Sequence, residues 1–321
     1  MTLVRLGYVA MSMELKNSSP SQTMTYDQFL KIGDKEAAIR KLERIAQSNI
    51  ENCLRLLKHN AFHDIKFFRL SSRLIPLATH DALAGWNYLT PLKNSLNEIG
   101  EFINEHKMRI DFHPDHFVLL NSPKKEILKA SITALKVHAH LLTAMKINLT
   151  HRCVLHVGGS YKDKEGALER FIENWGHVPQ KIQKMIMLEN DDKSFHIEDT
   201  LYLCEKLGIP LVFDLHHHLA NNKDMDYFPV WDQIVQTWSD SPLPMKMHIS
   251  SPKSEKNFTH HADYIDKNMF LSFLNTIKGS VNQLDCMIEA KQKDHALFRL
   301  IEQLKEEDSI EIVDEASFYL K

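Results

Sequence analysis

Six short apolar segments of the chain each end in a histidine or a carboxylate, the side chains that bind divalent metal ions in proteins. They lie at residues 109–113, 152–156, 185–189, 211–214, 245–248 and 285–289, and they end in His113, His156, Glu189, Asp214, His248 and Glu289. Apolar runs of this length, separated by long helical patterns, are typical of parallel strands buried on both faces. A (β/α)8 barrel forms its active site from such residues, one at the end of each strand. The pattern therefore predicts an enzyme with a centre of several metal ions.

Two further histidines follow these strands closely enough to reach the same centre. His217 lies three residues after Asp214 and could reach it if the chain turns there, and His261 follows the loop after the seventh strand. Mixed imidazole and carboxylate ligands suit Zn, Mn, Fe or Co, and the absence of thiolates argues against a closed structural zinc site. Several ions bridged by a carboxylate such as Glu189 are the arrangement used for phosphodiester cleavage.

Lys246 lies two residues before His248, so both side chains point to the same face of the strand. An ammonium group inside a barrel is costly unless it pairs with a carboxylate or loses its charge. Carbamylation, which would turn the lysine into an acidic group, and an ordinary ion pair fit the sequence equally well.

The side chains just beyond the strands give mixed evidence about an anionic substrate. His116 and Phe117 place two flat rings directly after His113, where they could stack on bases or wedge between them. Phe117 could equally begin the next apolar run and belong to the core. The lysines of these loops, Lys291 among them, alternate with acidic residues as in a solvated rim, and the net charge of −3 gives no support for a nucleic-acid partner.

Eight predicted strands alternate with helical patterns, which predicts one α/β domain, a TIM (β/α)8 barrel, over residues 1–321. The strands are expected at residues 3–8, 65–70, 109–113, 152–156, 185–189, 211–214, 245–249 and 285–289. Helices are expected at residues 35–57, 95–106, 124–147, 197–207, 265–278 and 294–306. Gly208 and Pro210 mark the end of the fourth of these helices. A short tail at residues 309–321 has no clear role.

Composition and missing motifs exclude several classes of protein. The chain is 43% hydrophobic and 25% charged, as in ordinary soluble globular proteins. Its four cysteines occur singly, which indicates buried thiols and a reducing compartment. With no apolar run of signal-peptide or transmembrane type, we expect a cytoplasmic protein without a membrane partner. The motifs G-x-G-x-x-G, Walker A and G-x-S-x-G are absent, which excludes a nucleotide cofactor and a serine hydrolase.

The ordered segments around these residues resemble the UV damage endonuclease family, relatives of endonuclease IV with a TIM-barrel fold. The match spans about residues 3–294, and the order of the segments is more specific than any single one. The matching segments are Leu6-Gly-Tyr8, Phe68-Arg-Leu-Ser-Ser72, Phe112-His-Pro114, Val118-Leu-Leu-Asn-Ser-Pro123, Leu155-His-Val-Gly-Gly159, Leu188-Glu-Asn-Asp191, Phe213-Asp-Leu-His-His217, Lys246-Met-His248, His261-Ala-Asp263 and Glu289-Ala-Lys291.

The resemblance implies an ATP-independent nuclease that nicks double-stranded DNA immediately 5′ to cyclobutane pyrimidine dimers and 6-4 photoproducts. Some members of the family also act at abasic sites. It further implies a monomer with up to three divalent ions, commonly manganese, with zinc, magnesium or cobalt as alternatives. A metal-activated hydroxide would attack the phosphorus in line. The ligands that carry over by motif are His113, His156, Glu189, Asp214, His217, His248, His261 and Glu289.

The same resemblance implies roles for the remaining residues. Glu189 would bridge two ions and act in catalysis with Glu289 and with Lys246, the family's modified lysine. Tyr8, His116 and Phe117 would be pushed into the duplex while the damaged pair is flipped out, and Lys291 would contact DNA. Some members have Gln-Tyr where this chain has His116 and Phe117. Phe117 keeps the flat ring of the tyrosine but lacks its hydroxyl. The resemblance therefore does not define the lesion preference of this chain.

Three other functions compete with this interpretation. A metal-dependent sugar isomerase or epimerase also places Glu, Asp and His at the strand ends of a barrel, but it needs fewer ions. An amidohydrolase can use a carbamylated lysine, but it would have a H-x-H pair after the first strand, where this chain has Gly7-Tyr8. A barrel used only for binding would be expected to have lost ligands.

Overall fold

Eight parallel strands form a closed sheet, which confirms the predicted TIM barrel. The computed structural model describes residues 1–222 and 225–321. The strands are β1 (Thr2–Val9), β2 (Phe67–Arg69), β3 (Arg109–Asp111), β4 (Cys153–His156), β5 (Ile186–Glu189), β6 (Leu211–Asp214), β7 (Met245–Ile249) and β8 (Gln283–Ile288). Their order around the sheet is β3-β2-β1-β8-β7-β6-β5-β4. The two ends meet through a parallel bridge between Phe112 and Cys153, where the Phe112 N–H donates to Arg152 O at 2.8 Å.

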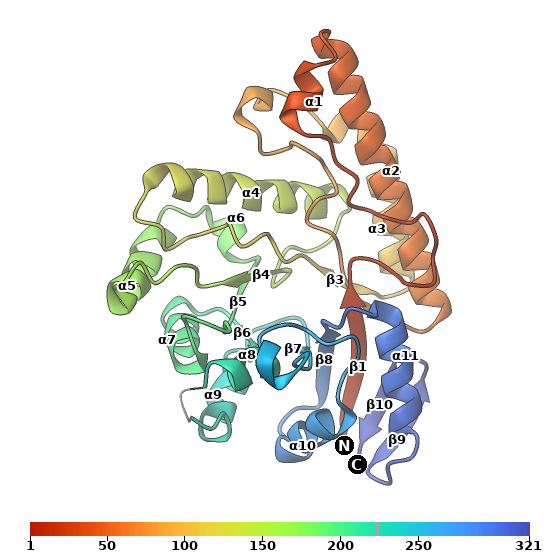
Figure 1. Ribbon diagram of the computed structural model, residues 1–321, viewed down its shortest axis with the longest axis vertical. Coiled ribbons are helices and arrows are strands. Elements are labelled where there is room, and N and C mark those ends of the chain that lie inside the picture. Colours follow the sequence, from red (N-terminus) through yellow and green to blue (C-terminus); the bar gives the residue numbers. More distant parts are fainter. Residues whose placement is uncertain (223–224) are drawn as a thin grey trace.

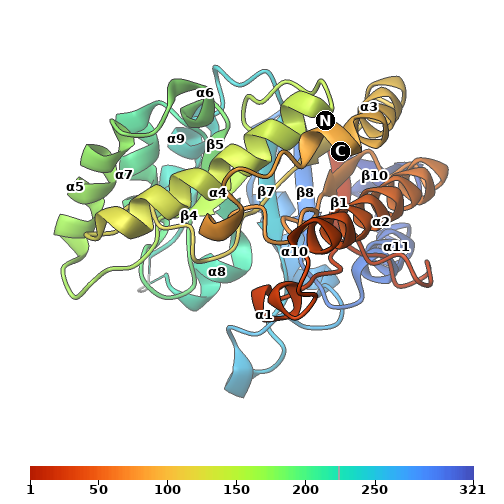
Figure 2. The same ribbon diagram turned by 90° about the horizontal axis from the view of Figure 1, so that it is seen from above.

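Helices connect the strands and lie outside them, with β1, β7 and β8 in the middle when the molecule is seen from above (Figures 1 and 2). The larger ones are α2 (Lys35–Phe62), α3 (Leu89–Glu105), α4 (Lys125–Ala144), α5 (Lys164–Trp175), α7 (Ile197–Leu207), α10 (Lys267–Thr276) and α11 (Lys293–Leu304). The shorter ones are α1 (Tyr26–Leu30), α6 (Gln180–Gln183), α8 (Leu215–Ala220) and α9 (Trp231–Gln236).

Local sequence explains where several helices begin and end. Asp34 caps α2, since its side chain accepts a hydrogen bond from the Ala37 N–H. The end of α7 lies where the sequence predicted it, because Gly208 adopts the left-handed conformation that closes this helix, at φ 63°. The sequence analysis missed α5, although Asp163 caps it and its apolar residues recur at helical spacing.

The barrel interior holds paired charges as well as apolar side chains. Arg109 on β3 reaches across to Asp285 on β8, with Nη1 2.8 Å from Oδ2, and Arg5 on β1 binds the same carboxylate at 2.7 Å. Above them, Phe67 fills the barrel beside Gly7. A Cβ at Gly7 would lie 2.2 Å from the Phe67 carbonyl oxygen, so only glycine fits there.

The tail, to which the sequence analysis assigned no role, is part of the sheet. Residues Ile310–Asp314 (β9) and Ser317–Leu320 (β10) form a hairpin, and β10 pairs antiparallel with β1, from Thr2 opposite Leu320 to Arg5 opposite Ser317. On β1, the short β2 pairs with the last three residues alone, Gly7–Val9. The first part of this edge of β1 is therefore free of β2, and β10 covers it. The two termini therefore lie side by side (Figure 1).

No helix within residues 1–222 and 225–321 combines the length and the hydropathy needed to cross a membrane.

Candidate metal centre

Four imidazoles surround one carboxylate at the C-terminal ends of the strands. Glu189, the last residue of β5, is fully buried. Its Oε2 lies 2.8 Å from His113 Nε2 and 3.8 Å from His156 Nε2. Its Oε1 lies 2.8 Å from His248 Nδ1 and 3.3 Å from His217 Nδ1. These side chains come from β4, β5, β7, α8 and the loop after β3, and the barrel alone brings them together.

Glu189 belongs to two separate groups that have the geometry of metal sites. The potential ligand atoms of His113, Glu189 and His248 lie within 4.8 Å of one another, and so do those of His156, Glu189 and His217. A carboxylate shared by two such groups is placed to bridge two ions. Burial raises the pKa of Glu189, but the neighbouring histidines, His248 and His156 foremost, outweigh it and hold this pKa well below its usual range. The carboxylate is therefore ionised and can serve as a ligand.

A carboxylate oxygen that lacks a partner supports the fit of a cation. Among the described residues, Asp214 Oδ2 is buried without a hydrogen-bond partner and lies 3.7 Å from His217 Nδ1. Leaving such an atom unpaired costs about 1–3 kcal/mol, so native proteins rarely do so. The residues at this centre fit divalent ions by donor type, by spacing and by this unpaired oxygen.

The chain turns after Asp214 in the way that His217 needs. Helix α8 begins directly after β6, and Asp214 caps it, with Oδ1 accepting the His217 N–H at 2.7 Å. Burial lowers the pKa of His217, but Asp214 and Glu189 outweigh it and raise this pKa to about 11. Burial, with help from Glu189 and Glu289, raises the pKa of Asp214 to about 7. His216 and His218, the neighbours of His217, are buried elsewhere.

Glu289 and His261 lie on the far side of the same centre. Glu289 Oε1 lies 3.2 Å from His248 Nδ1, and Glu289 Oε2 lies 4.0 Å from His261 Nδ1. The His261 ring nitrogen Nδ1 is also 2.6 Å from the Glu289 carbonyl oxygen, so its N–H donates there and orients the ring. The structure thus brings all eight predicted ligands to one end of the barrel.

Arg69 is a residue of this site that the sequence analysis missed. It ends β2, and its Nη1 lies 2.5 Å from Glu289 Oε1. Burial would lower the pKa of Arg69, but Glu289 outweighs it, so the guanidinium stays charged. Arg69 lies two residues after Phe67, which fills the barrel, so strand alternation could have identified it.

Lys246 forms a buried ion pair with Asp111 in this structure. Lys246 Nζ lies 2.6 Å from Asp111 Oδ2, across the barrel from β7 to β3, and neither side chain is exposed. Burial lowers the pKa of Lys246, with Asp111 opposing this effect. Of the two alternatives left open by the sequence, the structure contains the ion pair, and carbamylation stays a prediction. The partner, Asp111, lies two residues before His113 on the same strand face.

His116 and Phe117 project from the surface beside the centre. The side chain of His116 is 75% exposed and Phe117 is 71% exposed, with ring centroids 4.0 Å apart. The alternative that Phe117 belongs to the core is therefore wrong. Lys291 is also exposed, just beyond Glu289.

Tyr8 lies in a different environment from the one expected. It is fully buried, its hydroxyl donates to Asn60 Oδ1 on α2 at 2.6 Å, and its ring meets Phe68 edge-on. Side chains alternate along β1, so Tyr8 faces the helices, whereas Arg5 faces the interior. In this structure α2 covers the ring, and the predicted contact of Tyr8 with DNA stays a prediction.

Two cavities open beside side chains of the centre. One, of about 610 Å³, is lined by residues that include Met11, Arg69, Ser71, Arg73 and His113. The other, of about 460 Å³, is lined by residues that include His116, His156, Tyr161, Lys193 and His217. Each gives solvent a path toward side chains of the centre.

Comparisons with known proteins agree with the geometry. The family model described as UV-endonuclease UvdE matches residues 4–319. The UV DNA damage endonuclease of Halalkalibacterium halodurans is 54% identical over 315 residues, which cover 98% of each chain. The UV DNA damage endonuclease of Bacillus cereus is 42% identical over 302 residues, which cover 94% of this chain and 95% of the relative.

Solved structures show the same fold. SacUVDE matches with a TM-score of 0.82 at 34% identity, covering 94% of this chain and 98% of its own. Endonuclease IV from Thermus thermophilus matches with a TM-score of 0.56 at 13% identity, covering 94% of this chain and 99% of its own. The second likeness concerns the fold alone.

Proposed function

Because this chain belongs to the UV damage endonuclease family and is an endonuclease, we propose that it nicks double-stranded DNA immediately 5′ to UV photoproducts. The proposed lesions are cyclobutane pyrimidine dimers and 6-4 photoproducts, with abasic sites as a further substrate. The observation that carries the proposal is Glu189, a buried carboxylate shared by two groups of metal-binding side chains. Membership of this family argues against the sugar isomerase alternative.

The proposed cofactor is a cluster of up to three divalent ions, with manganese as first choice and zinc, magnesium or cobalt as alternatives. Bound ions of this kind supply a hydroxide at neutral pH and stabilise charge on the attacking and leaving oxygens. The proposed ligands are His113, His156, Glu189, Asp214, His217, His248, His261 and Glu289.

The chain's own side chains hold this centre and its substrate. Arg69 fixes Glu289 through a hydrogen-bonded ion pair, and it lines the larger cavity, where a guanidinium suits a phosphate. The pair of Lys246 and Asp111 lies directly below His248 and fills the barrel there. Lys246 in its carbamylated form remains part of the proposal.

Recognition of damaged DNA is assigned to the exposed side chains beside the centre. His116 and Phe117 offer two rings that can stack on bases without first breaking any core contact. Lys291 offers a charge to the DNA backbone. The cytoplasmic location and the monomeric state remain predictions.

Nicking of supercoiled plasmid tests the proposal. Purified protein with manganese should relax UV-irradiated plasmid and leave untreated plasmid intact, and EDTA should abolish the reaction. Equal nicking of both plasmids would keep the nuclease and remove the lesion specificity. Failure to nick either plasmid, with metal shown to be bound, would contradict the proposed function.

A further inference from the structure

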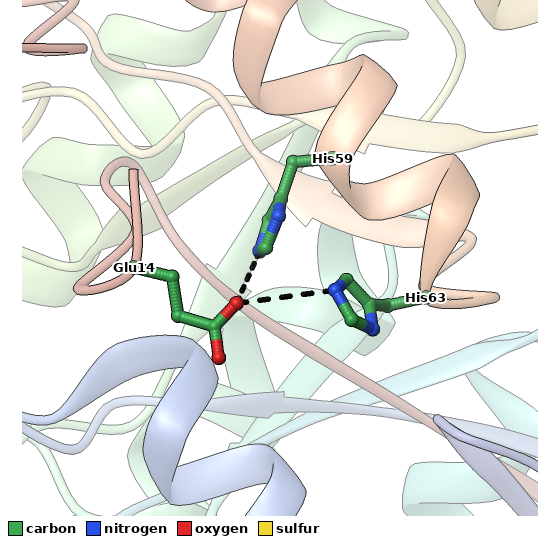
Figure 3. Close-up of side chains that lie close together, drawn as sticks. All are labelled: Glu14, His59 and His63. Carbon is green, nitrogen blue, oxygen red and sulfur yellow. Dashed lines mark ion pairs between the residues drawn. The ribbon is translucent and has the colours of Figure 1, made fainter. Parts of the chain in front are cut away.

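A third group of side chains with the geometry of a metal site lies outside the barrel and includes no residue of the centre at Glu189 (Figure 3). Glu14, in the loop after β1, faces two histidines that lie one helical turn apart at the end of α2. Its Oε2 lies 3.9 Å from His59 Nε2 and 3.9 Å from His63 Nε2. The spacing of four residues places both rings on one face of the helix, as in known zinc-binding helices.

Neighbouring carboxylates orient both rings. His63 Nδ1 lies 2.6 Å from Glu315 Oε2 in the β9–β10 turn, so Nδ1–H donates there and leaves Nε2 free to face Glu14. A carboxylate behind a histidine is the usual support of a metal ligand. His59 Nε2 faces two carboxylates, Glu14 at 3.9 Å and Asp294 at 3.2 Å. In this structure that nitrogen shares a hydrogen bond with Asp294 Oδ2, and a bound cation would take the place of the shared proton.

The surroundings favour a positive ion. Glu14 and His63 line a cavity of about 530 Å³ whose lining includes one lysine and five carboxylates, from Glu14, Asp64, Glu302, Asp314 and Glu315. His295 Nε2 also lies 3.7 Å from Glu14 Oε1, as a further nitrogen. The local field therefore attracts cations, and the nearby donors are nitrogen and oxygen atoms.

We propose that Glu14, His59 and His63 form a binding site for a transition-metal ion of the zinc class, separate from the centre at Glu189. Two imidazoles and one carboxylate suit Zn²⁺, Co²⁺ or Ni²⁺ better than Mg²⁺ or Ca²⁺. Donor atoms around a tetrahedral zinc ion lie roughly 3.4 Å apart. The observed 3.9 Å needs only small side-chain movements, and the half-exposed Glu14 is free to make them.

An ion at this site ties the loop after β1 to the end of α2. Asp294 already holds the start of that loop, since it accepts hydrogen bonds from Ser12 Oγ and, at 2.8 Å, from the Met13 N–H. Met11 of the same loop lines the cavity beside Arg69 and His113. The ion would therefore restrain one wall of the cavity next to the proposed catalytic centre.

Zinc stoichiometry of the full chain tests the site. His63→Ala should bind one zinc ion per chain fewer than the wild type in equilibrium dialysis. His106→Ala is the matched control, because His106 also caps the C-terminus of a helix, α3, and it should bind as many ions as the wild type. Equal stoichiometry in all three proteins would overturn the proposal. If His63→Ala fails to fold, Glu14→Gln, a change in an exposed loop, takes its place.

Anomalous scattering at the zinc edge locates the ion independently of nuclease activity. Crystals of the wild type soaked in micromolar zinc should show a peak between Glu14, His59 and His63, in addition to any peaks at Glu189. A zinc-bound protein with peaks at Glu189 alone would contradict this site and leave the proposed nuclease untouched. Protection of the loop after β1 from proteolysis by zinc should also disappear in His63→Ala.

Discussion

At the residue scale, the centre depends on a carboxylate that stays ionised although it is fully buried. Burying an isolated carboxylate is expensive, but Glu189 is surrounded by four imidazoles that share its charge. The same arrangement leaves the carboxylate free to bind cations on two sides. Replacing Glu189 with a neutral side chain of the same shape therefore tests the effect of its charge separately from the effect of its volume.

Glu189→Gln keeps the shape of the side chain and removes this charge. We expect nicking of irradiated plasmid to fall at least about 100-fold, because even outer-shell partners of metal ligands contribute 10- to 100-fold. Bound metal, measured by mass spectrometry, should fall as well, while circular dichroism stays unchanged. Glu101→Gln, in an exposed part of α3, is the control and should behave as the wild type. Full activity in Glu189→Gln would remove Glu189 from the mechanism.

Arg69→Met removes the partner of Glu289 and leaves a buried charge without compensation. In EDTA, the free energy of unfolding should fall by about 3–5 kcal/mol, as for other broken buried pairs. Added metal should recover part of this loss, because a cation replaces the guanidinium beside Glu289. Arg73→Met, which breaks an exposed pair with Asp115, should change the stability by less than about 1 kcal/mol. Urea titration measures both, and equal losses in the two variants would show that the Arg69 pair is not special.

At the scale of elements, α4 supports the centre through a buried histidine. His138 packs edge-on against Phe112, the residue before His113, and its Nδ1–H donates to Ala134 O at 2.8 Å. Burial lowers the pKa of His138 to about 4. Protonation would place a charge against Phe112 and the strand end that holds His113.

The folded-state pKa of His138 lies below the ordinary value of 6.5, so folding favours its neutral form. Its contribution to stability is full above pH 6.5 and is lost as the pH falls from 6.5 toward 4. The difference of the two pKa values corresponds to about 3 kcal/mol. Urea titrations across this range should show a shallower pH dependence for His138→Gln than for the wild type. The exposed His177→Gln should match the wild type, and an unchanged slope in His138→Gln would contradict this role.

The hairpin of β9 and β10 stabilises the barrel at its first strand. Phe318 is fully buried, whereas the next residue, Tyr319, is 36% exposed. Phe318→Ala should lower the free energy of unfolding by about 3–5 kcal/mol, as in other buried sites. Tyr319→Ala should cost less than about 1 kcal/mol. Thermal and urea unfolding measure both, and similar small losses would mean that the hairpin is dispensable.

At the scale of the whole molecule, an acidic chain has to hold DNA without a strong field of its own. The chain carries a net charge of −3. Divalent ions in the centre would make the electrostatic potential at the mouth of the barrel positive. Exposed rings next to the centre then add contacts that do not depend on charge. The affinity for DNA should therefore depend on metal and on stacking together.

Phe117→Ala removes one of the exposed rings without touching the core. Stacking of a base on an aromatic ring contributes about 1–3 kcal/mol, so the preference for irradiated over untreated plasmid should fall by roughly 5- to 150-fold. Metal content and melting temperature should stay at wild-type values. Phe228→Ala, at another exposed phenylalanine, is the control. Unchanged lesion preference in Phe117→Ala would exclude a stacking role for this residue.

Local sequence patterns were enough to predict the fold class and most of the residues at the strand ends. Apolar runs and helical patterns are local signals, and the strands that end in His156, Glu189 and Asp214 lie where these signals predicted them. Parallel strands of one barrel must end on the same face, so the position of the centre follows from topology. The full set of eight ligands came instead from the resemblance to the family, and their binding of metal stays a prediction.

Which side chains contact one another depends on the folded barrel. Arg69 with Glu289 and Lys246 with Asp111 are pairs between residues far apart in the chain, and no local pattern encodes them. The local sequence of the tail does not show that it pairs with the free edge of β1. The local sequence around Tyr8 does not show that α2 covers this side chain. The group of Glu14, His59 and His63 likewise forms only because the fold brings the loop after β1 against the end of α2. The spacing of apolar residues in a local segment favours a helix or a strand. Contacts across the barrel depend in addition on how all the strands are arranged around one interior.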